Sequence, residues 1–233
     1  MKLALISDIH SNLHALEAAL RAIEKHRVDA IYCLGDIVGY GADPGRCVDL
    51  VRRYCQATIL GNHDAAIASQ NGIGNLPRDG QVAARHNRSC LSESQLSFLA
   101  DLPLTHVVEN CTLVHATPRD PQDWVRFDSL ATVKDQFNYF DTEFCFVGHT
   151  HVPAVVAERL GVFRVKTGNR YIINVGSVGQ PRDENPLLGF VIFDTDTPSH
   201  ELIRLPYDLI GAAARIVEEG LPSSLSKRLA KGT

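Results

Sequence analysis

The chain has 233 residues, of which 45% are hydrophobic and 21% charged, and its formal net charge is −4 at pH 7. This length suits a single domain with a substantial core. The 23 basic and 27 acidic residues form no block of like charge, which argues against a long nucleic acid or an anionic membrane as partner. The apolar stretches are too short for a membrane span or a secretory signal. Six cysteines without a C-x-x-C pair favour a reduced, cytoplasmic protein over a disulfide scaffold.

The first 60 residues alternate between predicted strands and predicted helices. Apolar runs at 3–7, 30–34 and 57–60 are typical of buried strands. Asn12 is a suitable N-cap for the helix between the first two runs, and Asp43 precedes a proline that suits the first position of the next helix. This β-α-β-α-β order predicts a parallel sheet with right-handed crossovers.

Residues 65–103 are predicted to form a helical segment. Asp79 is a candidate cap for one helix, and Ser92 with Gln95 forms a capping box for another. The sequence leaves open whether this segment packs on the sheet or covers a site.

From residue 111 onward the pattern changes to a succession of strands. Strands are expected at 111–114, 144–147, 154–158, 162–166, 171–175, 188–194 and 200–205, with a hairpin turn at 167–169. Helices are expected near 128–139 and at 208–219, the second of them capped by Asp208 and stopped by Gly220 and Pro222. The whole chain, 1–233, is therefore predicted to be one α/β domain with a mixed sheet or two stacked sheets.

Five of the predicted strands run directly into polar residues that can bind a metal ion. These residues are Asp8, His10, Asp36, Asn62, His115, His149 and His151. Ligands collect at the carboxyl ends of strands in open α/β sheets, so the side chains converge if the five strands share one sheet edge. Asp8 and His10, and likewise His149 and His151, are two residues apart, so extended backbone would point both members the same way.

A set of this size exceeds the needs of one four-coordinate zinc site. It suits two metal ions about 3.5–4 Å apart that share a bridging carboxylate and act on a phosphoryl group. Imidazole and carboxylate ligands together favour Mn, Fe, Zn, Ni or Co over Ca or Mg.

The motifs D-x-H, G-D, G-N-H-D, H and G-H-x-H follow one another in an order that resembles the calcineurin-like metallophosphoesterases. The resemblance runs from Ile6 to about Pro206. The flanking stretches SDIHSNLHAL, LGDIVGYGADP, VGHTHVP and NVGSVGQPRD are similar to the small bacterial and archaeal phosphodiesterase branch. The resemblance implies a four-layer α/β/β/α sandwich with two mixed β-sheets and two bound divalent transition-metal ions, with manganese expected.

The resemblance also implies roles for individual residues. Asp8, His10 and His151 would bind the first metal, Asn62, His115 and His149 the second, and Asp36 both. A water or hydroxide that bridges the two ions would attack the phosphorus. His63 would stabilise or protonate the leaving oxygen, and Asp64 would orient its ring.

Three further residues have two interpretations each. Asn12 is a helix cap or a substrate contact, since a helix N-terminus beside a phosphate site is useful. Arg182 reaches substrate phosphate or lies on the surface. Trp124, the only tryptophan, belongs to the core or offers a surface on which a base stacks.

The predicted function is hydrolysis of phosphodiester bonds in small substrates. The first alternative is a phosphomonoesterase that acts on nucleotides or proteins. Protein serine/threonine phosphatases, which resemble this fold, have arginines beside their G-D and G-N-H motifs, whereas GDIVGYG and GNHDAAIA have none, which favours diesters. The second alternative is a non-enzymatic scaffold such as the retromer subunit, whose ligand set is degraded, whereas the set in this chain is complete. The sequence identifies neither the natural substrate nor the oligomeric state.

Overall fold

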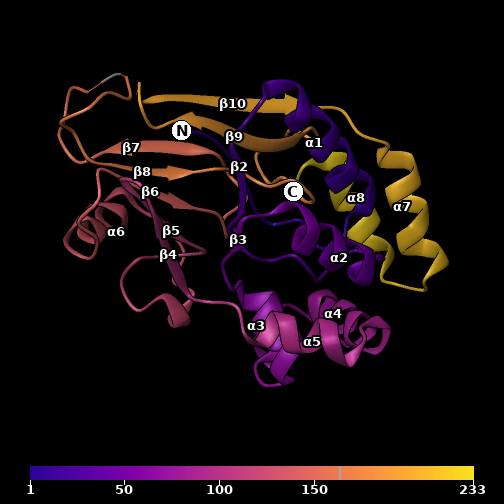
Figure 1. Ribbon diagram of the computed structural model, residues 1–233. Coiled ribbons are helices and arrows are strands. Elements are labelled where there is room, and N and C mark those ends of the chain that lie inside the picture. Colours follow the sequence, from indigo (N-terminus) through magenta and orange to yellow (C-terminus); the bar gives the residue numbers. More distant parts are fainter. Residues whose placement is uncertain (163) are drawn as a thin grey trace.

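The computed structural model describes residues 1–162 and 164–233, and its centre consists of two five-stranded sheets (Figure 1). The first sheet has the order β10-β9-β1-β2-β3, with β1 (Lys2–Ile6), β2 (Ala30–Cys33), β3 (Ala57–Thr58), β9 (Leu188–Asp194) and β10 (Ser199–Leu205). The second sheet has the order β4-β5-β6-β8-β7, with β4 (Thr105–Val108), β5 (Cys111–Val114), β6 (Phe144–Val147), β7 (Ala154–Ala157) and β8 (Tyr171–Asn174).

Both sheets are mixed. In the first sheet β1, β2 and β3 are parallel, as the β-α-β-α-β order predicts, while β9 and β10 add an antiparallel edge. In the second sheet β5, β6 and β8 are parallel, and β4 and β7 pair antiparallel at the two edges. The carboxyl ends of the six parallel strands are therefore divided equally between two sheets.

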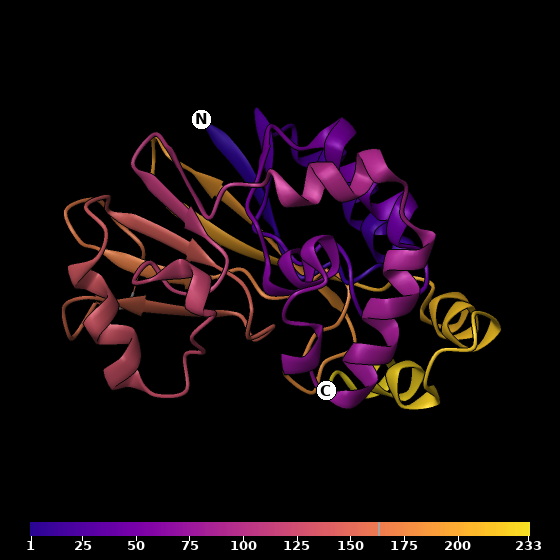
Figure 2. The ribbon, with the colours of Figure 1, turned by 90° about the horizontal axis from the view of Figure 1, so that it is seen from below.

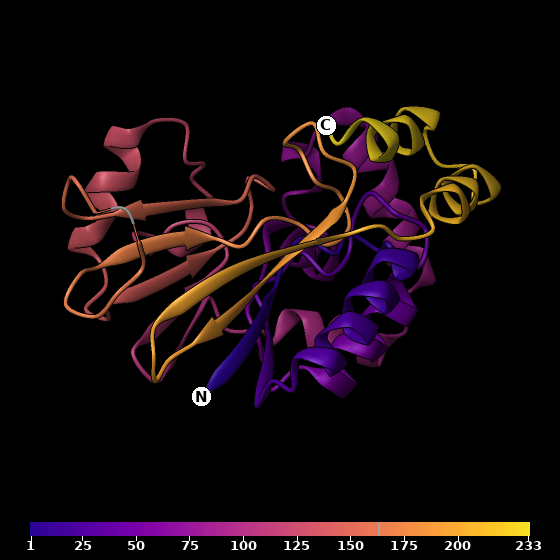
Figure 3. The same ribbon diagram turned by 90° about the horizontal axis from the view of Figure 1, so that it is seen from above.

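Helices cover the outer face of each sheet. Helices α1 (Leu13–His26) and α2 (Pro44–Tyr54) pack on the first sheet, and α6 (Leu130–Asp135) packs on the second. Figures 2 and 3 show the two sheets side by side between these helices. The predicted four-layer α/β/β/α sandwich is confirmed.

The alternation of side chains along β1 explains how the layers are held. Leu3 and Leu5 enter the core between the two sheets, while Ala4 and Ile6 enter the core beneath the helices. Successive residues of a strand point to opposite faces, so a continuous apolar run fits a strand that is buried on both sides. In the core between the sheets, the Phe193 ring lies 4.7 Å from the Phe144 ring, centroid to centroid.

The helical segment predicted at 65–103 contains α3 (Asn62–Ser69), α4 (Arg78–Cys90) and α5 (Glu93–Ala100). The capping box is present, because Ser92 accepts a hydrogen bond from the Gln95 amide at 3.3 Å and the Gln95 side chain accepts one from the Ser92 amide at 3.1 Å. The predicted cap at Asp79 is wrong. Pro77 occupies the N-cap position of α4, and the Asp79 carboxylate accepts a hydrogen bond from Ser224 instead.

Three other elements differ from the predictions. β4 was not predicted, since it is a short edge strand with alternate residues exposed. The predicted helix at 208–219 is α7 (Leu209–Glu218), and a further helix, α8 (Ser223–Lys231), follows it because Pro222 occupies an N-cap position. The strand predicted at 162–166 includes residue 163, which lies outside the described residues, and its neighbours 162 and 164–166 are not in a strand.

Within the described residues, no helix combines the length and apolar character that a bilayer span requires.

We predict that Phe193→Ala strongly destabilises the fold. The Phe193 ring is fully buried and packs against rings from the second sheet, so its removal leaves a cavity where the two sheets meet. Loss of a buried phenylalanine side chain costs about 3–5 kcal/mol of unfolding free energy. Urea denaturation followed by circular dichroism measures this. Val107→Ala, at an exposed position on the edge strand β4, is the control, and equal losses in the two variants would contradict the packing described.

Candidate metal centre and catalytic cleft

The predicted ligands come from the ends of strands in two sheets rather than from one sheet edge. Asp8, Asp36 and Asn62 follow β1, β2 and β3 of the first sheet, whereas His115 and His149 follow β5 and β6 of the second. The condition of one shared sheet edge, from which the convergence was argued, is therefore not met. The ends nevertheless converge, because the two sheets pack face to face with their parallel strands ending on the same side.

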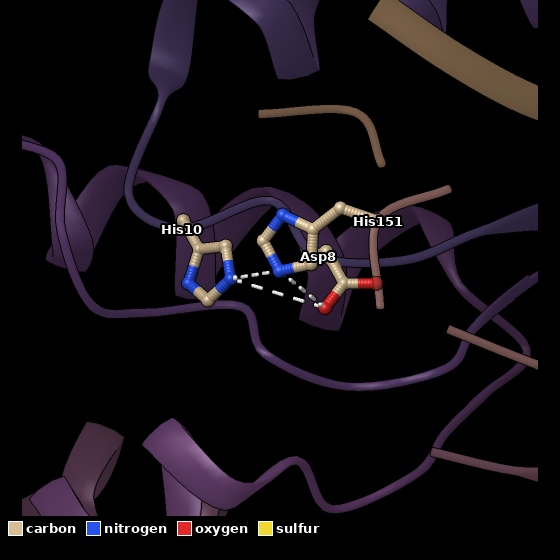
Figure 4. Close-up of side chains that lie close together, drawn as sticks. All are labelled: Asp8, His10 and His151. Carbon is tan, nitrogen blue, oxygen red and sulfur yellow. Dashed lines mark hydrogen bonds and ion pairs between the residues drawn. The ribbon is translucent and has the colours of Figure 1, made fainter. Parts of the chain in front are cut away.

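The first cluster contains Asp8, His10 and His151, whose ligand atoms lie within 4.8 Å of one another. The Nε2 atom of His151 lies 3.2 Å from Asp8 Oδ1 and 3.1 Å from His10 Nε2. Figure 4 shows these three side chains pointing toward one common position. Three potential ligand atoms therefore face the same small volume.

The second cluster contains Asp36, His115 and His149, again within 4.8 Å. Asp36 Oδ2 lies 3.5 Å from His115 Nε2, and the same oxygen lies 3.6 Å from His10 Nε2 of the first cluster. Asn62 joins the second cluster, with Oδ1 at 3.3 Å from His115 Nε2. Asp36 is therefore the carboxylate shared by both clusters.

The hydrogen bonds on the far side of three imidazoles determine which nitrogen carries a proton. The Nδ1 atoms of His10, His115 and His151 lie 3.1, 2.7 and 2.5 Å from the carbonyl oxygens of Val38, Leu34 and Gln180, respectively. A carbonyl oxygen only accepts, so each Nδ1 is the donor. In a neutral ring the Nε2 atom is then unprotonated and carries a free lone pair. All three Nε2 atoms face the clusters. Outer hydrogen bonds of this kind are typical of histidines that bind metals.

Burial and charge in the site also fit cations. Burial lowers the pKa of His10 well below its usual value and lowers that of His151, so these rings stay neutral. For His115, burial lowers the pKa but the adjacent Asp36 carboxylate raises it to about 9. The two carboxylates therefore attract positive charge strongly enough to outweigh the loss of water around an imidazolium.

Two polar atoms in the clusters have unmet bonding capacity. Among the residues that the structure describes, Asp8 Oδ1 and His149 Nε2 are buried and have no hydrogen-bond partner. Buried polar groups are nearly always satisfied, and exceptions need an explanation. Divalent ions held between the carboxylates and the bare Nε2 atoms would satisfy both, so the residues present fit the two metal ions expected for this site.

The other oxygen of each carboxylate is fixed by the backbone. Asp8 Oδ2 accepts a hydrogen bond from the His149 amide at 3.0 Å, and Asp36 Oδ1 accepts one from the His63 amide at 2.8 Å. Glycines make this approach possible. A Cβ atom at Gly61 would lie 2.2 Å from Asp36 Oδ1, and one at Gly148 would lie 2.5 Å from Asp8 Oδ2. This explains the glycine that precedes the ligand in these two motifs.

The ligand backbones are left-handed, not extended as predicted. Positive φ angles of 49–63° occur at Asp8, His10, Asp36, His149 and His151. Residues other than glycine seldom adopt this conformation, and it concentrates at functional sites. His149 and His151 belong to different clusters, although extended backbone would have pointed them the same way, whereas Asp8 and His10 belong to the same cluster.

His63 lies beside both clusters. Its ring is buried, with its centroid 4.9 Å from that of His10 and 4.5 Å from that of Tyr40. Burial lowers the pKa of His63 to about 4. The predicted contact from Asp64 to this ring is not formed. The Asp64 carboxylate accepts hydrogen bonds from the Val38 amide at 3.1 Å and the Gly61 amide at 3.2 Å, so it braces the loops that surround Asp36.

A cavity of about 560 Å³ opens over the clusters. Its floor includes Asp36, Asn62, His63, His149 and His151, and its walls include Tyr40, Trp124, Arg126, Arg182 and Arg228. The end of α3 and the turn at 71–77 form another wall, so part of the segment 65–103 borders the site. This volume is in the range of sites that hold small molecules.

The structure decides between the interpretations given above for Asn12, Trp124 and Arg182. Asn12 caps α1, accepting from the Ala15 amide at 3.1 Å and donating to the Gly179 carbonyl at 2.8 Å, and it does not border the cavity. Trp124 is half-buried in the cavity wall, with its ring 5.9 Å from that of His115. Arg182 also lies in the wall.

The sequence analysis did not identify Tyr40 and Arg228 as residues of the cavity wall. Tyr40 had a signal, since it stands between two glycines in the stretch LGDIVGYGADP that follows β2. Arg228 had none, because it belongs to α8, a helix that was not predicted.

Comparisons with known proteins agree with this geometry. A family model described as "Calcineurin-like phosphoesterase superfamily domain" matches residues 1–198. An uncharacterised protein of Methanocaldococcus jannaschii is 38% identical over 241 residues, which cover 99% of this chain and 98% of that protein. A metallophosphoesterase from Sphaerobacter thermophilus has a crystal structure with a TM-score of 0.88 at 37% identity, over 100% of this chain and 99% of the other. A hypothetical protein from Pyrococcus horikoshii shares the fold, with a TM-score of 0.81 at 23% identity over 100% and 98% of the two chains.

We predict that His149→Ala weakens metal binding. His149 offers an unpartnered Nε2 atom to the second cluster, and its removal deletes one candidate ligand from the cavity floor. Loss of only a hydrogen-bond partner of a ligand costs roughly 10–100-fold in metal affinity, so loss of a ligand should cost at least as much. Elemental analysis after dialysis against Mn²⁺ measures the metal bound. His26→Ala, at the end of α1, is the control, and an unchanged metal content in both variants would contradict the assignment.

Proposed function

The chain belongs to the calcineurin-like phosphoesterase superfamily, and we propose that it hydrolyses phosphodiester bonds of small substrates with two divalent metal ions. The observation that carries this proposal is the pair of histidine and aspartate clusters that share Asp36 on the floor of the cavity. A shared carboxylate suits two ions held close together, which would stabilise the attacking and leaving oxygens of an in-line displacement at phosphorus.

In this proposal each cluster would hold one ion. Asp8, His10 and His151 would hold the first, Asn62, His115 and His149 would hold the second, and Asp36 would serve both. Divalent ions bound there would activate water as the nucleophile and neutralise charge that develops on the phosphoryl oxygens. Manganese is our first choice, and the imidazole and carboxylate donors also suit Fe, Zn, Ni or Co.

The protein's own groups position the reaction. The hydrogen bonds from Val38, Leu34 and Gln180 fix three imidazole rings, so their Nε2 atoms need no rearrangement when substrate binds. His63 borders the cavity beside the clusters, where a leaving oxygen would emerge. We assign to His63 the donation of a hydrogen bond or proton to that oxygen.

A phosphomonoesterase is the second candidate. Arg182 borders the cavity, and its amide donates to the His151 carbonyl at 3.4 Å, so the residue lies next to the first cluster. Arginines beside the metals hold a monoester dianion well. Diesters remain the first candidate because the G-D and G-N-H motifs themselves carry no arginine.

Hydrolysis of bis-p-nitrophenyl phosphate and of p-nitrophenyl phosphate tests the proposal. We expect metal-stripped protein to regain activity with Mn²⁺ and to prefer the diester. Asp36→Asn should abolish this activity, since the variant loses the shared carboxylate charge. Preference for the monoester would favour the second candidate. No turnover with any of several metals would contradict both enzymatic proposals and favour a scaffold.

We predict that His63→Ala binds both metals and turns over slowly. Loss of a general acid lowers kcat by roughly 10²–10⁴-fold while leaving the metal ligands in place. Steady-state kinetics and elemental analysis on the same preparation measure the two effects, with His86→Ala on α4 as control. A metal content that falls together with kcat would mean that His63 is a ligand, which its closeness to His10 and Asp36 makes the relevant alternative.

A further inference from the structure

Two guanidinium groups converge on one aromatic ring in the cavity wall. The Cζ atoms of Arg182 and Arg228 each lie 5.5 Å from the centroid of the Tyr40 ring. Arg182 comes from the loop before β9, and Arg228 comes from α8, so the chain brings them together across 46 positions of sequence. The two positive charges repel each other, so their placement on one ring requires an explanation.

The hydrogen bonds of these side chains leave donors unused. Arg182 Nη2 donates to Gln180 Oε1 at 2.9 Å, and its Nε is buried without a partner among the described residues. Arg228 Nε donates to the main-chain oxygen of Thr233 at 2.8 Å. Within residues 1–162 and 164–233, neither forms an ion pair with an Asp or Glu side chain, and the nearby Asp183 carboxylate pairs with Arg204 at 3.0 Å. Among the described residues no carboxylate side chain therefore forms an ion pair with either guanidinium, and Asp79 acts on Arg228 only from beyond ion-pair distance.

The backbone under the two arginines is held firmly. The Glu184 amide donates to the Gly232 carbonyl at 2.9 Å, which joins the Arg182 loop to the end of α8. A Cβ atom at Gly232 would lie 2.6 Å from the Asn185 amide nitrogen, so the two segments are in direct contact. Arg204 also donates to the Asn185 carbonyl at 3.0 Å. The pair is thus built into the fold and does not depend on flexible side chains meeting by chance.

The ring of Tyr40 contacts His63, His10 of the first cluster and the two arginines. Its centroid lies 4.5 Å from that of His63 and 4.8 Å from that of His10. The Arg182 amide donates to the His151 carbonyl at 3.4 Å, so the loop that carries Arg182 also contacts the first cluster. The two guanidinium groups lie close enough to repel each other, since burial lowers the pKa of Arg228 and the charge of Arg182 lowers it further. The pair therefore lies in the cavity wall next to the clusters.

We propose that Arg182 and Arg228, supported by the ring of Tyr40, bind a second phosphoryl group of the substrate beside the phosphodiester that is cleaved. This rests on the proposed phosphodiesterase function and narrows its substrate class to small molecules that carry at least two phosphoryl groups. Guanidinium groups match phosphate oxygens with paired donors, and a bound dianion removes the repulsion between the two cations.

Cation–π contact alone is the simpler account of the pair. Such contacts are stabilising, and more so when the cation is removed from water. That account explains why one arginine rests on Tyr40. It leaves unexplained why both face a cavity that leads to a phosphoesterase centre, and why the buried Nε of Arg182 has no partner among the described residues.

Two matched diesters test the proposal: thymidine 5′-(p-nitrophenyl phosphate) and the same compound with a 3′-phosphate. We expect the wild-type protein to favour the phosphorylated compound in kcat/KM by roughly 10–100-fold, as expected for hydrogen bonds to a charged group. Arg228→Gln should bring the ratio of the two values close to one, mainly through KM. Arg228→Lys should restore part of the ratio, since it keeps the charge but loses the paired donors. Lys227→Gln, an exposed neighbour on α8, should keep the ratio of the wild type.

Calorimetry provides a readout that does not depend on turnover. Thymidine 3′,5′-bisphosphate should bind the wild-type protein more tightly than thymidine 5′-phosphate, and Arg228→Gln should remove the difference. Equal kcat/KM values in the wild type, an unchanged ratio in Arg228→Gln, or an equal loss in Lys227→Gln would overturn the proposal. If no diester is cleaved at all, the phosphodiesterase function fails, while the calorimetric difference still decides whether the arginine pair binds a second phosphoryl group.

Discussion

The buried carboxylate of Asp36 is the group on which the site and the meeting of the two sheets depend. One oxygen accepts a hydrogen bond from the His63 amide at 2.8 Å. The other oxygen faces His10, which follows a strand of the first sheet, and His115, which follows a strand of the second. A buried carboxylate is unstable unless hydrogen bonds and positive charge surround it. Both conditions are met only when the ends of β1, β2 and β5 are brought together, so the position of this one side chain couples the chemistry to the packing of the layers.

That convergence imposes unfavourable local structure, which the core offsets. Left-handed backbone outside glycine costs on the order of 1–3 kcal/mol per residue, and it occurs at both Asp8 and Asp36. The loops are secured by backbone hydrogen bonds such as Asp8 N to Gly35 O at 3.0 Å. The apolar core between the sheets, which includes Phe193, holds the two sheets together. The free-energy cost of the strained backbone at the strand ends is therefore offset by the burial of apolar side chains in the core.

The sequence indicated which side chains meet in the candidate site but little of their geometry. Apolar runs that end in polar residues located the strands and the site, because both depend on local pattern. The division of those strands between two sheets is a matter of long-range pairing, which no local pattern specifies. The predicted Asp64 contact failed for a similar reason: the sequence places Asp64 next to His63, but its oxygens are taken by the amides of Val38 and Gly61. Helix α8 was missed because a proline ends some helices and begins others.

The reaction centre and the walls of the cavity have different origins in the chain. The candidate metal ligands come from strand ends within residues 1–198, the part that the family model matches. The walls come from connections and added helices, with Trp124 between β5 and α6 and Arg228 on α8, beyond residue 198. Strand ends are constrained by the need to bring the candidate ligands together, whereas loops and peripheral helices can change without disturbing the core. Members of this superfamily that share the centre can therefore differ in substrate, and the features that select the substrate of this chain are to be sought in its walls.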